Sequence, residues 1–555
     1  MDDLKLYANS PDSLTKQIEV VASISKDINM KLNVNKCAET HFIPKRLKNA
    51  QVTVAATKSN DRSICFPMLD GEAVYKYLGI EQKVRLKEPV AWDRAYGRCY
   101  EIARKLWDSD LTFRQKVNSY NSTIIPVFRY IASCVAKGSG KYASVLKRGT
   151  RLDKKFRKLL VKLKSRYKCS CVARLYLTTD MGGYGLKSIK NAIEESTIYL
   201  WAYLCTKAEL KGSLNLFVTM ANREKRCVVS DARSILKAYD IDYQLEEERS
   251  TVVIDGASFN DARALARHVV ELMRTVNNTR WYQTWKKLEL AGRVLHPKAN
   301  MDLIESFTWL KEGKLSSVAV RNAIAAQEGC LITRTHPSQV HSSDKSCRAC
   351  RSALETVEHV LPGCPKWLPN LYVDRHDSVA RSIHYRICRK FGLTPPHYSQ
   401  KVESVLENDS IKLYWNQPVQ IKALIRDNKP DIIVFNKPNK TALIIEVAVS
   451  WFTGIERQIQ IKTSRYCVNG NWEHDMKLPY PLGDNLQREL QTSDWKVTFL
   501  PVVIGTVGEV LSNLKGDLGE KIGLDAKAAA DCLERMRRSA VLGTSRIIKN
   551  HLAGE

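Results

Sequence analysis

The chain has 555 residues, 44% of them hydrophobic, which is enough for about three or four globular domains. Its 87 Lys and Arg residues exceed its 59 Asp and Glu residues, and the net charge of +28 favours a phosphate-rich partner, nucleic acid before an anionic membrane. No apolar run approaches a membrane-spanning length, the N-terminus lacks a signal-peptide pattern, and the 15 cysteines are too scattered for a disulfide scaffold. We therefore expect a soluble intracellular protein with reduced cysteines.

Three short motifs follow one another in the N-terminal part of the chain. Asp2 and Asp3 are adjacent, residues 30–37 read MKLNVNKC, and residues 75–80 read YKYLGI. Alone, the two carboxylates would be a frayed acidic terminus. Together, the stretches resemble the last three palm motifs of reverse transcriptases of non-LTR (LINE-type) retrotransposons. The resemblance implies that Asp2 and Asp3 help to hold two magnesium ions, and it implies a primer grip at Tyr75, Lys76, Tyr77, Leu78 and Gly79.

The same resemblance implies that part of the polymerase is missing. The family's fingers and the earlier palm strand, which carries the first metal-binding aspartate, have no counterpart in this sequence. Two-metal chemistry needs carboxylates from both strands. We therefore expect a truncated polyprotein that does not polymerise DNA by itself, in which Lys36, similar to the family's triphosphate-site lysine, has no partner site.

Residues 89–190 are expected to form a helical thumb. Apolar residues at positions 152, 156, 159, 160 and 163 form one helical stripe. Lysines occupy the other faces, among them Lys154, Lys155, Lys158 and Lys162. Such charge is either a solvated helix face or a surface that follows phosphates, and next to a primer grip we favour nucleic-acid binding. Residues 121–130 and 174–186 resemble thumb segments of the same elements.

A cysteine-rich module follows a predicted helical linker at 191–340, in which no chemistry is evident. Cys347, Cys350, His359 and Cys364 have the spacing C-x2-C-x8-H-x4-C. Three sulfur donors and one imidazole suit a closed tetrahedral zinc site, so we predict a structural zinc knuckle within residues 341–395. The alternative is a chance grouping of four residues. His376, flanked by acidic residues, suggests a second metal site or a catalytic base, but helix capping and local ion pairing are favoured.

Two apolar, β-rich runs at 430–435 and 442–449 predict a β-hairpin. A turn centred between Pro438 and Asn439 places Asp431 opposite Glu446. Two unpartnered carboxylates are costly between strands built from Ile, Val, Leu and Phe, and a cation would relieve that cost. Oxygen ligands suit magnesium, so the hairpin predicts a magnesium site. The alternative is a structural hairpin in which Glu446 forms a salt bridge.

The segment after the hairpin adds a lysine. Ile455, Ile459, Lys462 and Tyr466 are spaced as one helical stripe, which directs Lys462 inward toward a negative partner. Together with the hairpin acids, this resembles the PD-(D/E)xK nuclease fold in the variant found in non-LTR elements. The resemblance implies that Asp431, Glu446 and Lys462 are catalytic, whereas Arg465 stands where the family carries a second lysine and is expected to contact nucleic acid.

The combined prediction is a multidomain α+β protein, with a resemblance to site-specific, R-two-type retrotransposon polyproteins over nearly the whole chain. We expect a partial palm (1–88), a helical thumb (89–190), a helical linker (191–340), a CCHC zinc knuckle with flanking helices (341–395) and an α/β PD-(D/E)xK-like nuclease domain (396–555). The expected function is magnesium-dependent nicking of a DNA target, with binding of element RNA and DNA by the thumb and knuckle, in the nucleus and away from membranes.

Two other functions remain open at this stage. The chain could be a non-catalytic nucleic-acid-binding remnant of a decayed element, or a host nuclease that acquired the domain. The sequence also leaves self-association and the target DNA site open.

Overall fold

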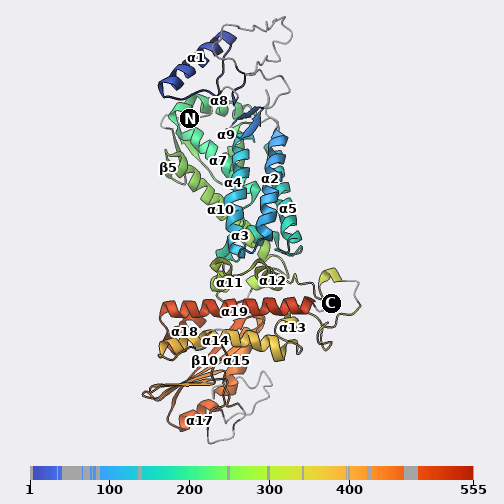
Figure 1. Cartoon of the computed structure of the whole chain (residues 1–555), viewed down its shortest axis with the longest axis vertical. Coiled ribbons are helices and arrows are strands. Elements are labelled where there is room, and N and C mark those ends of the chain that lie inside the picture. Colours follow the sequence, from blue (N-terminus) through green and yellow to red (C-terminus); the bar gives the residue numbers. More distant parts are fainter. Residues whose placement is uncertain are drawn as a thin grey trace. The chain divides into compact units, whose positions relative to one another are not determined.

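The computed structural model describes residues 4–33, 36–39, 66, 75–77, 79–82, 88–135, 141–246, 250–296, 300–339, 343–395, 397, 400–421, 425, 427–467 and 485–553. This part of the chain is mostly helical with small sheets, which agrees with the predicted α+β class (Figure 1). It divides into two compact units that are each discontinuous in sequence. Unit 1 holds residues 1–101, 126–152 and 189–267, and unit 2 holds residues 102–125, 153–188 and 268–555.

Unit 1 consists of helices and two small antiparallel sheets. Its elements are α1 (Pro11–Asp27), β1 (Tyr75–Tyr77), β2 (Ile80–Gln82), α4 (Ile125–Val135), α7 (Ile189–Thr206), α8 (Lys211–Asn222), α9 (Val228–Ala238), β3 (Gln244–Glu246), β4 (Thr251–Ile254) and β5 (Ala257–Phe259). Strands β3, β4 and β5 form a three-stranded sheet, which the expectation of a helical segment at 191–340 did not include.

The predicted primer grip lies on the short hairpin of β1 and β2. Tyr77 pairs with Ile80, and Gly79 lies in the short connection between these two strands. Gly79 has φ +76°, a conformation that glycine adopts without the steric cost that a Cβ atom would bring. The stretch thus forms a turn between two short strands, and its role in binding a primer stays a prediction.

Three long helices contribute residues to both units: α2 (Glu88–Asp108), α5 (Tyr142–Lys162) and α10 (Ala262–Lys286). Helix α5 is the predicted basic amphipathic helix. Its apolar stripe is buried, and its four singled-out lysines are exposed: Lys154, Lys155, Lys158 and Lys162. The helix therefore has one face in a core and one face in solvent.

Unit 2 contains the remaining elements. Before the sheet these are α3 (Phe113–Ser119), α6 (Val172–Tyr176), α11 (Leu303–Glu312), α12 (Ser317–Gln327), α13 (Val357–Val360) and α14 (Val373–Lys390). The sheet and its helices are β6 (Val405–Glu407), β7 (Ile411–Trp415), β8 (Ile432–Asn436), β9 (Thr441–Ser450), α15 (Ile455–Tyr466), α17 (Leu486–Thr492), β10 (Lys496–Gly505), α18 (Leu514–Ile522) and α19 (Ala526–Ala553).

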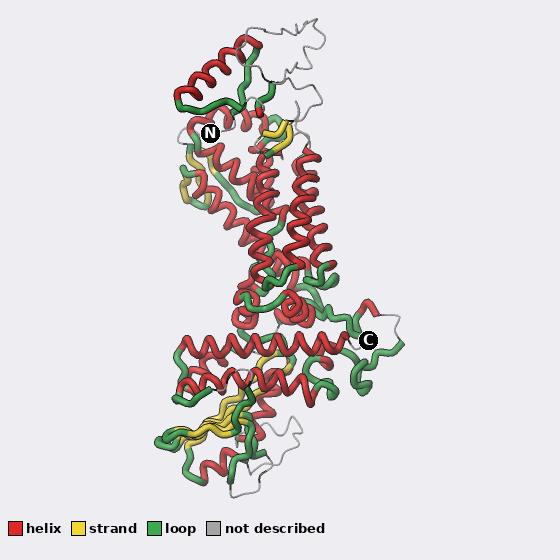
Figure 2. Tube along the Cα trace, viewed as in Figure 1, coloured by secondary structure: helices red, strands yellow, loops and turns green. Residues whose placement is uncertain are grey.

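The five-stranded sheet has the order β10-β9-β8-β7-β6, antiparallel except for the parallel pair β9 and β10. Helix α15 connects these two parallel strands, as a crossover connection requires. The strands lie between helices on both faces (Figure 2). This arrangement explains the near-continuous apolar runs of β8 and β9, because both faces of these strands are buried.

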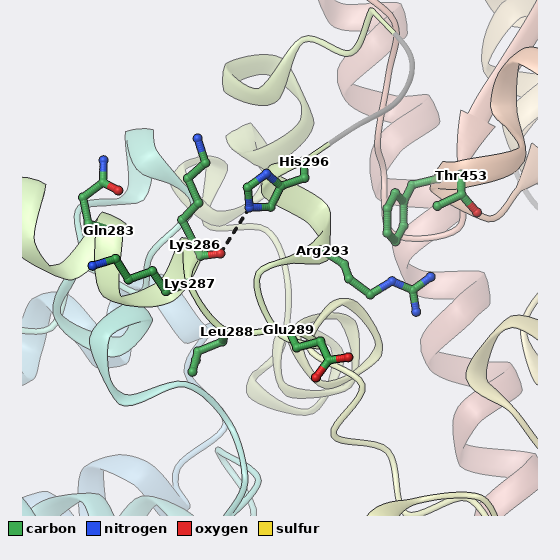
Figure 3. Close-up of a pocket in the computed structure, with 9 residues that line it drawn as sticks. Gln283, Lys286, Lys287, Leu288, Glu289, Arg293, His296 and Thr453 are labelled. Atoms are coloured by element: carbon green, nitrogen blue, oxygen red, sulfur yellow. Dashed lines mark hydrogen bonds between the residues drawn. The ribbon is translucent and has the colours of Figure 1, made fainter.

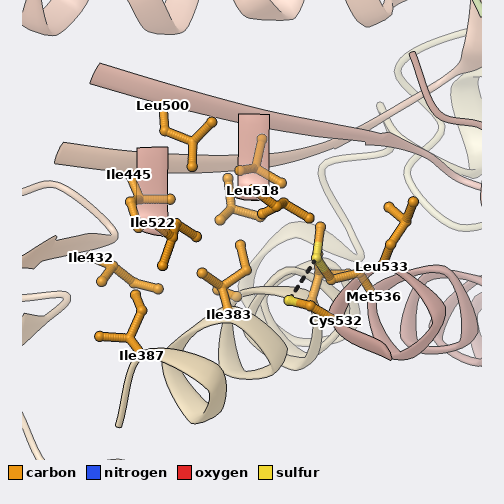
Figure 4. Packing of buried hydrophobic residues seen from close by; sticks show 14 of the residues in the cluster. Ile383, Ile387, Ile432, Ile445, Leu500, Leu518, Ile522, Cys532, Leu533 and Met536 are labelled. Atoms are coloured by element: carbon orange, nitrogen blue, oxygen red, sulfur yellow. Dashed lines mark hydrogen bonds between the residues drawn. The ribbon is translucent and has the colours of Figure 1, made fainter. Parts of the chain in front are cut away.

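The larger core lies between the sheet and helices α14, α18 and α19 (Figure 4). Ile432, Ile445 and Leu500 point from three neighbouring strands toward Ile383 of α14 and Met536 of α19. The opposite face of the sheet packs against α15 and α17. Two such cores fix the sheet from both sides and hold the hairpin of β8 and β9 in place.

None of the described helices is both long enough and apolar enough to cross a lipid bilayer.

Candidate active site and metal centre

The hairpin of β8 and β9 has the predicted register. Ile432 pairs with Ile445, so Asp431, directly before β8, comes opposite Glu446 in β9. The Asp431 backbone N–H donates to Glu446 Oε1 at 2.9 Å. The Val447 backbone N–H donates in turn to Asp431 Oδ2 at 2.8 Å. Both carboxylates are therefore held by the backbone of the strand that faces them.

Helix α15 brings a lysine to this acid pair. Lys462 Nζ donates to Glu446 Oε2 at 2.5 Å and lies 3.7 Å from Asp431 Oδ2. The predicted inward stripe is confirmed, because Ile455 and Tyr466 at the two ends of the helix are buried. The predicted negative partner of Lys462 is also confirmed, since it is the pair of hairpin carboxylates.

A histidine from α14 completes the cluster, and sequence reasoning missed its partner. His376 Nε2 lies 3.1 Å from Asp431 Oδ2 and 3.2 Å from the Val447 carbonyl oxygen. Its Nδ1 lies 3.0 Å from Asp377 Oδ1, so the predicted local ion pair exists. The contact with Asp431, 55 residues further along the chain, was not predicted from the sequence. The helical position of His376 alone does not reveal that α14 packs beside β9.

The charges of this cluster are strongly coupled. Burial raises the pKa of Glu446, and the nearby Asp431 charge raises it further. Burial opposes ionisation of Asp431, but the hydrogen bond from His376 and the charges of His376 and Lys462 bring its pKa below the usual value. Burial disfavours a charged His376, yet its bonds to Asp377 and Asp431 raise its pKa to about 10. The two carboxylates thus have opposite tendencies to ionise.

The cluster is partly exposed to solvent. The Glu446 side chain is 2% exposed, whereas the side chains of Asp431, Lys462 and His376 are 18%, 15% and 26% exposed. Its oxygen donors, two carboxylates and the Val447 carbonyl, are of the type that magnesium prefers. Among the described residues, however, these acids and His376 do not form a group whose ligand atoms all lie within 4.8 Å of one another. Magnesium binding here stays a prediction.

The predicted zinc ligands do come together. The ligand atoms of Cys347, Cys350, His359 and Cys364 all lie within 4.8 Å of one another. Cys347 Sγ and Cys364 Sγ are 3.9 Å apart, close to the ~3.8 Å expected for two sulfurs bound at about 2.3 Å to one tetrahedral zinc. Cys350 Sγ lies 3.2 Å from His359 Nε2. This donor set fits zinc.

Local structure positions these ligands. Thr356 caps α13 by accepting the His359 backbone N–H at 3.0 Å, which sets the orientation of the first helical turn. Burial would raise the pKa of the Cys350 thiol, but hydrogen bonds from Ser352 and contacts with Cys347 and His359 lower it to about 6. A thiol with this pKa is largely a thiolate at neutral pH, the form that binds metal.

A buried acid supports the cysteine cluster from outside. Glu355, completely buried, accepts hydrogen bonds from the Arg348 backbone and side chain and from the Arg334 backbone N–H. His551 Nε2 at the end of α19 lies 3.3 Å from Glu355 Oε2. The C-terminal helix is therefore tied directly to the loop between Cys350 and His359.

The remaining predicted residues fall into two groups. Asp2, Asp3 and Leu78 lie outside the described residues, so the predicted polymerase magnesium site cannot be compared with the structure. Arg465 is half-buried on α15, one turn from Lys462, and its contact with nucleic acid stays a prediction.

A scan of the sequence against models of protein families gives no match, and a search of curated proteins gives none either.

Proposed function

We propose that this chain is a metal-dependent endonuclease that nicks DNA, with a PD-(D/E)xK-like domain at its C-terminus. One observation carries the proposal: Lys462 Nζ lies 2.5 Å from Glu446 Oε2 and 3.7 Å from Asp431 Oδ2, although the three residues come from three different segments. These are the segments that resemble the PD, acidic and lysine motifs of nucleases in non-LTR retrotransposons. We further propose that the chain belongs to the polyprotein of such an element.

The geometry suggests a role for each side chain. A magnesium ion held by Asp431 and Glu446 would supply an activated water for attack on phosphorus. Lys462 stands beside both carboxylates, where its ammonium group can orient that water or offset charge that develops on the phosphate. His376 on α14 lies 3.1 Å from Asp431 Oδ2, and its hydrogen bond and charge favour the ionised form of that carboxylate.

The structural alternative is an ion pair that only stabilises the hairpin. The salt bridge between Lys462 and Glu446 fits that alternative too. A purely structural pair has no need of partly exposed charges, whereas the side chains of Asp431, His376 and Lys462 are all partly exposed to solvent. We therefore favour the enzyme over a remnant that binds nucleic acid without cutting it.

Zinc and nucleic-acid binding belong to the same proposal. The Cys3His cluster would act as a structural zinc knuckle, and the exposed lysines of α5 would contact phosphates of element RNA or target DNA. Zinc content near one ion per chain, lost in Cys350→Ser and kept in the exposed-cysteine control Cys134→Ser, is the expected result. Equal zinc content in both variants would contradict the knuckle.

Nicking of supercoiled plasmid tests the nuclease. The purified chain is incubated with magnesium beside Glu446→Ala, and the substitution and omission of magnesium are each expected to abolish the nick. A wild-type chain that binds DNA in a salt-sensitive manner but never nicks it would leave only the binding remnant. A nick that persists in Glu446→Ala would place the activity elsewhere or in a contaminant.

A further inference from the structure

A large cavity of about 870 Å³ lies in unit 2, apart from the acid cluster (Figure 3). One wall is the C-terminal end of α10 and the turn after it, with Lys286, Lys287 and Leu288. The other wall is the short helical turn between β9 and α15, with Phe452 and Thr453. Segments about 160 residues apart in sequence therefore enclose one space, of a size typical of ligand-binding pockets.

The cavity is positively charged. Lys286, Lys287 and Arg293 line it, against one carboxylate, Glu289. Arg293 donates to Glu358, which fixes its guanidinium in place. Within the part of the chain that the structure describes, no acid lies within ion-pairing distance of Lys286 or Lys287. Two lysines without acidic partners in one concave space form a site for phosphates.

Apolar groups accompany these charges. Phe452 lines the cavity but is only 3% exposed, and the Arg293 guanidinium lies 6.0 Å from the centre of its ring. Leu288 is 42% exposed at the rim. His296 Nε2 donates to the Lys286 carbonyl oxygen at 3.2 Å and thereby closes the end of α10 (Figure 3). Cations next to apolar surface suit a single strand, because its unpaired bases can place their faces against apolar side chains. In a duplex the base faces are stacked on one another and cannot make such contacts.

The cavity is close to the acid cluster along the chain. Glu446 and Phe452 are six residues apart, so their backbones are separated by at most about 20 Å. A second, smaller cavity of about 230 Å³ shares Arg293 and Phe452 with the first and reaches Glu358 of α13. The concave surface thus extends toward α13, which carries the predicted zinc ligand His359.

We propose that this cavity binds a single-stranded segment of nucleic acid beside the nuclease centre. Lys286 and Lys287 contact consecutive phosphates, and the exposed Leu288 side chain contacts an unpaired base. The inference rests on the proposed nuclease function for its biological meaning, but the binding itself does not require cleavage.

Fluorescence anisotropy with a labelled 15-nucleotide oligothymidylate tests the proposal, in buffer without added magnesium. The double variant Lys286→Gln/Lys287→Gln is expected to bind about tenfold more weakly than the wild type. The slope of log affinity against log salt is expected to fall by about 1.4, because two phosphate contacts to a single strand are lost. The matched control Lys527→Gln/Lys549→Gln removes the same charge from exposed positions of α19 and is expected to change binding less than twofold.

Three outcomes would overturn the inference. The cavity variant could bind the oligonucleotide like the control, its salt slope could stay unchanged, or a blunt duplex of the same length could lose as much affinity as the single strand. A wild-type chain that does not nick plasmid contradicts only the proposed nuclease. A nicking enzyme whose cavity variant binds single strands normally contradicts only the cavity.

Discussion

Unit 2 contains two buried charged networks that differ in how completely they are closed. In the first, the Arg174 side chain is fully buried, and its Nε donates to the Gly182 carbonyl oxygen at 2.8 Å. Its other nitrogens donate to Gln327 at 2.6 Å and to Glu328 at 3.5 Å. The guanidinium also stacks 4.3 Å from the centre of the Trp285 ring. Protein groups thus satisfy this arginine on every side.

The second network, at the hairpin, concentrates charge without enclosing it. Asp431 and Glu446 lie close enough for each to affect the other's pKa, and Lys462 and His376 remain partly exposed. A closed network such as the one around Arg174 gives a core its specific packing. An open network whose groups have shifted pKa values, such as the one at the hairpin, is typical of a functional site. The comparison predicts that the first network matters to stability and the second to activity.

The largest expected effect is on the closed network. Replacing Arg174 with Met leaves Glu328 as an unpaired buried carboxylate, whose pKa burial already raises. We expect a loss of about 3–5 kcal/mol in the free energy of unfolding, measured by urea denaturation. The exposed pair Lys311 and Asp180 serves as control, and Lys311→Met is expected to cost less than about 0.5 kcal/mol. An equal loss of stability in Arg174→Met and Lys311→Met would contradict the expectation that the buried ion pair matters more than the exposed one.

In the open network, a substitution is expected to reduce nicking without reducing stability. Glu446→Gln keeps an acceptor for the Asp431 backbone N–H and removes a carboxylate whose raised pKa shows that its charge is unfavourable in the fold. Nicking should fall at least about 100-fold, or ~2.7 kcal/mol of transition-state stabilisation, with an unchanged or higher melting temperature. A variant that is destabilised as much as Arg174→Met would favour the purely structural hairpin.

The features that could be predicted from the sequence are those set by residues close together in the chain. The spacing of Cys347, Cys350, His359 and Cys364 covers 18 residues, so one knuckle and one short helix bring the ligands together. The turn of the hairpin determines its register over the next eight residues on either side, which is why Asp431 and Glu446 could be paired in advance. Helical spacing alone directed Lys462 inward.

The parts that sequence could not predict depend on contacts between distant segments. His376 precedes Asp431 by 55 residues and reaches it only because α14 packs on the sheet. Arg174 and Glu328 are separated by 154 residues, and their segments were assigned to a thumb and a linker without any link between them. The spacing of residues within one segment does not indicate which distant segments pack against each other. The cavity beside Phe452 was unforeseen for the same reason.

Two histidines on α14 offer a pH test of the contrast between closed and open surroundings. His384 is fully buried, and burial, with a contribution from the Arg381 charge, lowers its pKa to about 4. In the unfolded chain, His384 binds a proton once the pH falls below about 6.5, whereas in the folded chain it does so only near pH 4. Protonation therefore favours the unfolded chain, and the free energy of unfolding falls as the pH drops from 6.5 toward 4. At pH 5 the loss attributable to His384 should be on the order of 2 kcal/mol.

Urea denaturation at pH 7 and pH 5 measures this loss, and His384→Gln removes the titrating group. The variant should show a pH dependence smaller by that amount, whatever its stability at pH 7. An unchanged pH dependence would mean that His384 is not the group responsible.

His376 gives the smallest expected effect, and it concerns metal binding. In the open network the charged His376 lies beside Asp431, one of the proposed magnesium ligands, and repels a cation there. The Val447 backbone N–H also holds Asp431, so the carboxylate keeps its orientation without the histidine. His376→Gln should therefore bind magnesium about tenfold more tightly by calorimetry, or ~1.4 kcal/mol, because a neighbouring positive charge is removed. His384→Gln on the same helix is the matched control and should leave the affinity unchanged. Weaker magnesium binding in His376→Gln would show instead that the histidine's hold on Asp431 outweighs its charge.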